Sequence, residues 1–103
     1  MSLAGTRTLI AYDSGIELDV EYLSDTELEW KGTAGPAAGK SGTESLSVIE
    51  LAPGIYVVGW IEADGTAVTN VISVEAGAVV AHVTFDTPQG RRSALQRGAF
   101  TPA

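Results

Sequence analysis

The sequence predicts an all-β protein in which about eight short antiparallel strands close into a small up-and-down barrel. Candidate strands recur about every dozen residues, and turn-forming residues separate nearly all of them. No segment shows the period of an amphipathic helix. Short hairpins connect most strands, which favours a meander over a Greek key, and closure would remove exposed sheet edges. The chain is expected to form one domain, 1–103.

Four strands are expected in the first half of the chain, at residues 6–12, 16–22, 26–33 and 43–51. The clearest is 16–22, where apolar residues alternate with Glu and Asp and so give the strand one apolar and one acidic face. The segment 32–42 contains four glycines and a proline. It is therefore expected to form an extended loop, and loops of this length often cover or form binding sites.

Three further strands are expected at 54–62, 66–74 and 78–85. The run 54–62 is apolar at nearly every position, which predicts a central strand covered on both faces. Asp-Gly at 64–65 predicts a tight hairpin after it. The tail 91–100 is compatible with an eighth strand or a short helix, and its three arginines indicate a solvated segment.

Composition excludes several classes of function. The formal net charge is −7 with six basic residues, so the chain lacks the positive surface that nucleic acids or anionic membranes require. Cysteine is absent, which excludes disulfides, thiolate nucleophiles and cysteine metal sites. One histidine and scattered carboxylates predict no metal site and no cofactor. No apolar segment has the length of a signal peptide or a membrane span, and a cytoplasmic protein is expected.

The fifth predicted strand ends on a carboxylate, Glu62. It shares a strand face with Tyr56 and Trp60, because side chains two residues apart point to the same side of a strand. Such a residue is either a solvated rim carboxylate or the polar end of a pocket. The same two interpretations apply to Tyr12, and Lys40 is either a solvated loop lysine or a third pocket residue.

Several segments together carry a family resemblance. They are Tyr-Asp-Ser-Gly at 12–15, Ala-Gly-Pro-Ala-Ala-Gly-Lys at 34–40 after a Trp-bearing strand, and Ala-Pro-Gly-Ile-Tyr-Val-Val-Gly-Trp-Ile-Glu at 52–62, followed by Gly-Thr at 65–66. Their order and spacing resemble the calycin-type barrels of phenolic acid decarboxylases and of molybdenum cofactor biosynthesis protein F. The likeness covers roughly residues 5–85. It implies a lipocalin-like barrel with a ligand cavity and, by analogy with the decarboxylases, a homodimer.

The resemblance also implies site residues. The decarboxylases line their cavity with two tyrosines two residues apart on the first strand, an arginine in the glycine-rich segment and a glutamate after the tryptophan. The second tyrosine matches Tyr12 and the glutamate matches Glu62. The first tyrosine falls on Ile10, which has no hydroxyl. The arginine falls on Lys40, which keeps the charge but lacks the bidentate guanidinium.

Two main hypotheses for function follow. In the first, the protein is a binding module for a small, partly apolar organic ligand, with Tyr12, Lys40 and Glu62 at the polar end of its cavity. The side chains of Ile10, Trp30, Tyr56 and Trp60 are expected to contact that ligand. In the second, it is a cofactor-free lyase acting on a phenolic or related carboxylic acid, with Glu62 as general acid/base. A third alternative is an interaction domain whose interior is simply filled.

Overall fold

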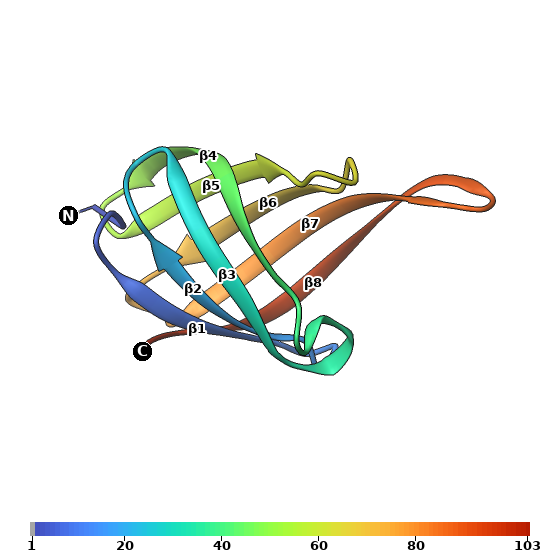
Figure 1. The fold of residues 1–103 in the computed structure, drawn as a ribbon. Coiled ribbons are helices and arrows are strands. Elements are labelled where there is room, and N and C mark those ends of the chain that lie inside the picture. The colour runs from blue at the N-terminus through green and yellow to red at the C-terminus, as the bar shows by residue number, and fades with distance from the viewer. Residues whose placement is uncertain (1) are drawn as a thin grey trace.

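Eight antiparallel strands form a closed barrel in which each strand pairs with its neighbours in sequence and β1 pairs with β8 (Figure 1). The computed structural model describes residues 2–103. The elements are β1 (Arg7–Tyr12), β2 (Glu17–Tyr22), β3 (Glu27–Ala34), the 3-10 helix η1 (Gly35–Ala37), β4 (Ser41–Ala52), β5 (Ile55–Ile61), β6 (Ala67–Ser73), β7 (Ala78–Thr87) and β8 (Gly90–Pro102). The predicted all-β, up-and-down barrel is confirmed. Within the described residues, no helix is long and apolar enough to cross a membrane.

The predicted loop at 32–42 is wrong in extent. Strand β3 continues to Ala34, η1 turns the chain, and β4 begins at Ser41. The glycines of this segment allow close contacts within the sheet as well as the turn of the chain. A Cβ at Gly32 would lie 1.8 Å from the carbonyl oxygen of Ala37, so η1 can fold back onto β3 only because position 32 has no side chain.

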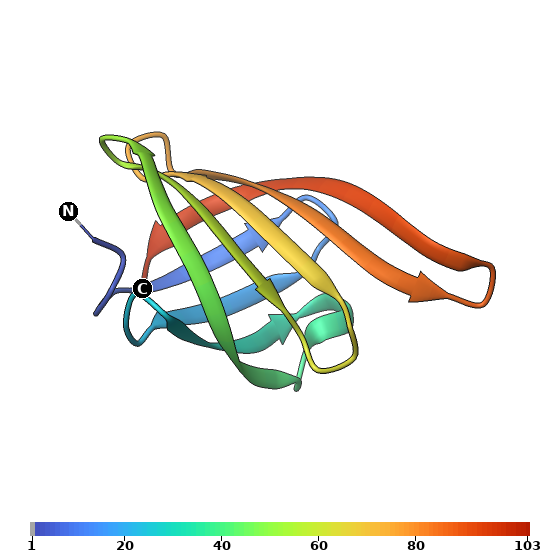
Figure 2. The same ribbon diagram turned by 90° about the horizontal axis from the view of Figure 1, so that it is seen from above.

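The tail at 91–100, for which the sequence left a strand or a short helix open, forms part of strand β8. Strands β7 and β8 are the partners in a hairpin that extends past the rest of the barrel (Figures 1 and 2). The molecule is accordingly elongated, with principal extents of 41 × 23 × 21 Å. This hairpin is longer than the predicted strand 78–85 because the pairing continues to Thr87 and Gly90.

Strand β5 is covered on its inner face only, so the expectation of a strand covered on both faces is wrong. Tyr56, Val58 and Trp60 are buried, whereas Ile61 is 70% exposed. The physical reason is that the barrel has a single wall, and no second layer packs on its outside. The apolar outer residues of this strand therefore meet solvent.

The barrel interior is filled with side chains at one end. Ile10, Tyr22, Leu28, Val58 and Ile72 are at most 1% exposed and pack together there. Leu3, from the segment before β1, is also buried in this core and is held by backbone hydrogen bonds between Gly5 and Tyr22 and between Thr6 and Leu3. An interior of eight strands is just wide enough for such side chains to fill. We call this the closed half of the barrel.

Replacing Gly32 by alanine tests the fit between η1 and β3. The new Cβ would collide with the backbone of Ala37, so we expect the free energy of unfolding to fall by about 1–3 kcal/mol. Gly59→Ala is the matched control, because its Cβ would have no heavy atom closer than 3.7 Å. That variant should be neutral or slightly more stable. Urea unfolding followed by tryptophan fluorescence measures both, and equal stability of the two variants would contradict the proposed contact.

Candidate functional site

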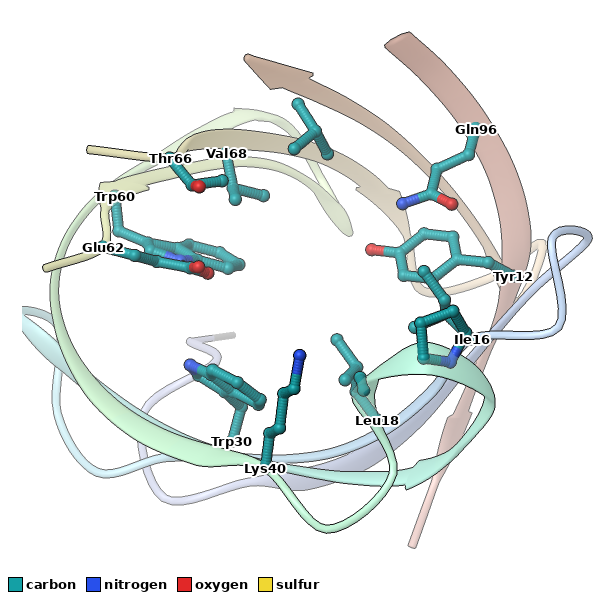
Figure 3. A pocket seen from close by; sticks show the side chains of 13 residues that line it. Tyr12, Ile16, Leu18, Trp30, Lys40, Trp60, Glu62, Thr66, Val68 and Gln96 are labelled. Carbon is teal, nitrogen blue, oxygen red and sulfur yellow. The ribbon is translucent and has the colours of Figure 1, made fainter. Parts of the chain in front are cut away.

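The other half of the barrel encloses a cavity of about 270 Å³. It opens where the β1–β2 turn, η1 and the β5–β6 turn come together, and we call this opening the mouth (Figure 3). Most of its wall is apolar. The lining residues are Tyr12, Ile16, Leu18, Trp30, Pro36, Ala37, Lys40, Trp60, Glu62, Thr66, Val68, Val83 and Gln96.

Two tryptophans in the cavity wall each donate a hydrogen bond to a carboxylate. Trp60 Nε1 donates to Glu62 Oε2 at 3.1 Å, and Trp30 Nε1 donates to Glu44 Oε2 at 2.9 Å. Gly42 leaves room for the second pair, since a Cβ there would lie 2.8 Å from both hydrogen-bonding atoms. The indole N–H groups therefore satisfy acids that the barrel has partly removed from water.

Glu62 is the acidic residue in the lining of the cavity. Burial raises the pKa of Glu62, and the nearby negative charge of Glu44 adds to this effect, whereas the hydrogen bond from Trp60 opposes it. A carboxyl with a raised pKa holds its proton at higher pH than an exposed glutamate does. Glu62 can therefore accept or, once protonated, donate a hydrogen bond within the cavity.

Tyr12 lies across the opening from Trp60 and Glu62 (Figure 3). Its hydroxyl donates to Oδ1 of Asn70 at 3.3 Å, and Asn70 is itself only 1% exposed. Burial raises the pKa of Tyr12 to about 12, so its hydroxyl is protonated at neutral pH. Tyr12 is thus a neutral hydroxyl whose proton is donated to a buried amide and whose oxygen can still accept a hydrogen bond.

Lys40 brings a positive charge to the mouth. It precedes β4, and its side chain points into the opening beside Trp30 (Figure 3). Within residues 2–103, Lys40 takes part in none of the ion pairs. Its ammonium therefore remains available to a polar group of a bound molecule.

The structure brings five of the seven predicted site residues around this one cavity: Tyr12, Trp30, Lys40, Trp60 and Glu62. It does not place Ile10 or Tyr56 there. Ile10 is 1% exposed in the closed half, and Tyr56 lies at the far end of β5 beside Leu3 and Val48. Strand parity predicts which face a side chain occupies but not its depth, and four residues along a strand span about 13 Å.

Sequence reasoning missed other polar residues of the site, namely Glu44, Thr66, Asn70 and Gln96. Glu44 shares its strand face with Leu46, a signal that could have placed it inside the barrel. Gln96 could be placed only once the tail was known to be a strand. Across residues 2–103, no group of three or more His, Asp or Glu side chains could hold a metal ion.

The raised pKa of Glu62 predicts the direction in which stability changes with pH. The folded state holds the Glu62 proton more tightly than the unfolded state, so this residue's contribution to stability falls as pH rises through its folded pKa. We expect Glu62→Gln to gain stability relative to the parent protein between about pH 4 and pH 7. Urea unfolding at several pH values measures this difference.

Asp19→Asn provides a control of opposite sign. The hydrogen bond from Arg7 lowers the pKa of Asp19, so its contribution to stability is present above the unfolded pKa and is lost as pH falls. This variant should lose stability relative to the parent protein as pH rises to about 4, the unfolded pKa of an aspartate, and its deficit should stay constant above that pH. If the difference between Glu62→Gln and the parent protein also stays constant from about pH 4 to pH 7, as expected for Asp19→Asn, then Glu62 is not desolvated.

The fold of this barrel is similar to that of a protein of known structure. A crystal structure of a Burkholderia vietnamiensis protein described as a "putative beta-lactamase" superposes with a TM-score of 0.89 at 23% sequence identity, covering 100% of this chain and 97% of that one. At this identity the likeness shows the fold alone. No curated protein sequence matches the chain.

A family profile adds the decisive assignment. The profile of the MoaF-like family matches residues 4–96, which include every strand up to the middle of β8 and all of the cavity lining. The chain therefore belongs to the MoaF-like family.

Proposed function

We propose that this protein binds a small organic molecule whose apolar body occupies the cavity and whose polar groups meet Tyr12, Lys40 and Glu62. The observation that carries this proposal is the contrast between the two halves of the barrel. One half is filled by side chains, whereas the other keeps a cavity of about 270 Å³ with an apolar wall and a few polar groups. Ligand sites in proteins have this composition.

The side chains suggest how a ligand would be oriented. The indole rings of Trp30 and Trp60 offer flat apolar surfaces to an aromatic or planar body. The Tyr12 hydroxyl is a neutral acceptor, Lys40 is a cation, and Glu62 can accept or donate according to its protonation. A ligand with oxygen atoms on a planar body fits these groups best.

The neutral fluorescent probe N-phenyl-1-naphthylamine tests the cavity. We expect a saturable rise in its fluorescence, since its environment becomes apolar on binding. Val83→Phe fills part of the cavity and should weaken the affinity about tenfold or more. Val80→Phe is the matched control because Val80 lies on the outer face of the same strand, 38% exposed. Loss of binding in both variants, or no binding by the parent protein, would contradict the proposal.

A lyase acting on a phenolic carboxylic acid is the second candidate, and the raised pKa of Glu62 favours it. The substrate carboxylate would leave as carbon dioxide, and a proton from Glu62 would reach the carbon that carried it. The position that the family resemblance gives to the first of the two tyrosines holds Ile10, which is buried in the closed half. The carboxylate would therefore be held by Lys40 alone, because the Tyr12 proton is donated to Asn70.

Ultraviolet spectra of hydroxycinnamic acids incubated with the protein test this activity. If the lyase proposal holds, the absorption of the conjugated acid should fall with time, and Glu62→Gln should abolish the change while still binding N-phenyl-1-naphthylamine. Unchanged spectra across several such acids would exclude the lyase and leave the binding proposal intact.

A further inference from the structure

The β7–β8 hairpin continues the cavity wall beyond the mouth. Val83 and Gln96 line the cavity, and the pairing of the two strands continues outward from them through Phe85↔Arg92 to Thr87↔Gly90. Figures 1 and 2 show this part of the hairpin projecting from the end of the barrel that carries η1 and the β5–β6 turn. We call residues 84–95 the arm.

The arm is braced against the barrel rim. Arg91 Nη1 donates to Asp86 Oδ1 at 2.9 Å, and Arg91 Nη2 donates to the carbonyl oxygen of Gly65 at 2.8 Å. Gly65 lies in the β5–β6 turn, which forms part of the mouth. These bonds fix the arm relative to the opening, which an isolated two-stranded ribbon could not do by itself.

One face of the arm is continuous with the cavity wall. Because side chains alternate along a strand, Phe85 lies on the same side of β7 as Val83, and Arg92 lies on the same side of β8 as Gln96. Phe85 and Arg92 are cross-strand partners, so an apolar ring and a guanidinium stand side by side. Phe85 is half-buried and Arg92 is exposed.

Among the basic side chains of the described residues, Arg92 differs in its ion pairing and in the face of the strand on which it lies. Of the six basic residues in this chain of net charge −7, Arg7, Lys31 and Arg91 form ion pairs with carboxylates. Among the other three, Arg97 pairs in register with Val80 on the outer wall. Lys40 and Arg92 are left on the inner side, one at the mouth and one on the arm.

The carboxylates of the mouth decide where an anionic group could lie. Glu62 stands on the wall opposite Tyr12 and Gln96 (Figure 3), and Glu44 is hydrogen-bonded to Trp30. Both carboxylates would repel a nearby anion. Arg92 is on the Gln96 side and four residues further out, about 13 Å along the strand. An anion at Arg92 is therefore separated from both acids.

We propose that Phe85 and Arg92 form an outer subsite that binds the anionic end of an elongated ligand whose apolar body fills the cavity. This inference rests on the proposed binding function and adds a ligand class to it, an amphipathic organic acid longer than the cavity. The methylene chain of the ligand crosses Phe85, and its carboxylate accepts hydrogen bonds from the Arg92 guanidinium.

Phenylalkanoates of increasing chain length and the matching phenylalkanols test the subsite by displacing N-phenyl-1-naphthylamine. For each length, the ratio of alcohol to acid dissociation constants measures the preference for the carboxylate. The Arg92→Gln variant should lower this ratio about fivefold for the longest chains, such as phenyloctanoate, and leave it unchanged for phenylacetate, which is too short to reach the arm. Added salt should reduce the preference of the parent protein.

Arg97→Gln is the matched control, since it removes the same charge from the outer face of the same strand. An equal effect of the two variants would mean that only overall charge matters, and the subsite would be wrong. A carboxylate preference that does not depend on chain length would overturn it equally, while the binding function would stand. If neither the probe nor any phenylalkanol binds the parent protein, both proposals fall together.

Discussion

The pairing of β1 with β8 is the contact on which the rest of the structure depends. It joins residues almost at opposite ends of the chain, from Thr8↔Pro102 to Tyr12↔Gly98, and it converts a meander with two exposed edges into a barrel with none. Gly98 permits it, because a Cβ there would lie 2.6 Å from the carbonyl oxygen of Ala11. Tyr12 and Gln96, which form one wall of the cavity, stand together only because this seam closes.

Closure also explains why the cavity occupies one half of the barrel. Aromatic and branched side chains fill the narrow interior of the closed half, and Leu3 is buried with them. Towards the mouth the wall stays mostly apolar, but a few inward positions carry polar groups, including Tyr12, Glu44 and Glu62. The indole partners of Glu44 and Glu62 reduce the cost of holding these acids in an apolar wall.

Much of the architecture follows from the alternation of residues, and the limits of that pattern are physical. Alternation identified the second strand and correctly put Tyr12, Trp60 and Glu62 on inward faces, because a strand has only two sides. Depth along the barrel is set by register between strands, which a single sequence does not state, so Tyr56 and Ile10 were assigned to a cavity they do not line. Gly32 and Gly42 suggested a loop, yet their role is to make room for Ala37 and for the Trp30–Glu44 pair.

The electrostatic arrangement of the mouth links the cavity to the arm. Glu44 and Glu62 each have an internal donor, so neither needs a ligand cation to satisfy its hydrogen-bonding capacity. Among the described residues, Lys40 and Arg92 are the cations that lie on the inner side without a carboxylate partner. Lys40 lies at the mouth, and Arg92 lies further out on the arm. From the cavity outward, the polar groups are the neutral hydroxyl of Tyr12, then Lys40, and last the guanidinium on the arm. In that order the polarity rises outward, and in the proposed subsite this gradient would orient an amphipathic acid with its apolar end inside.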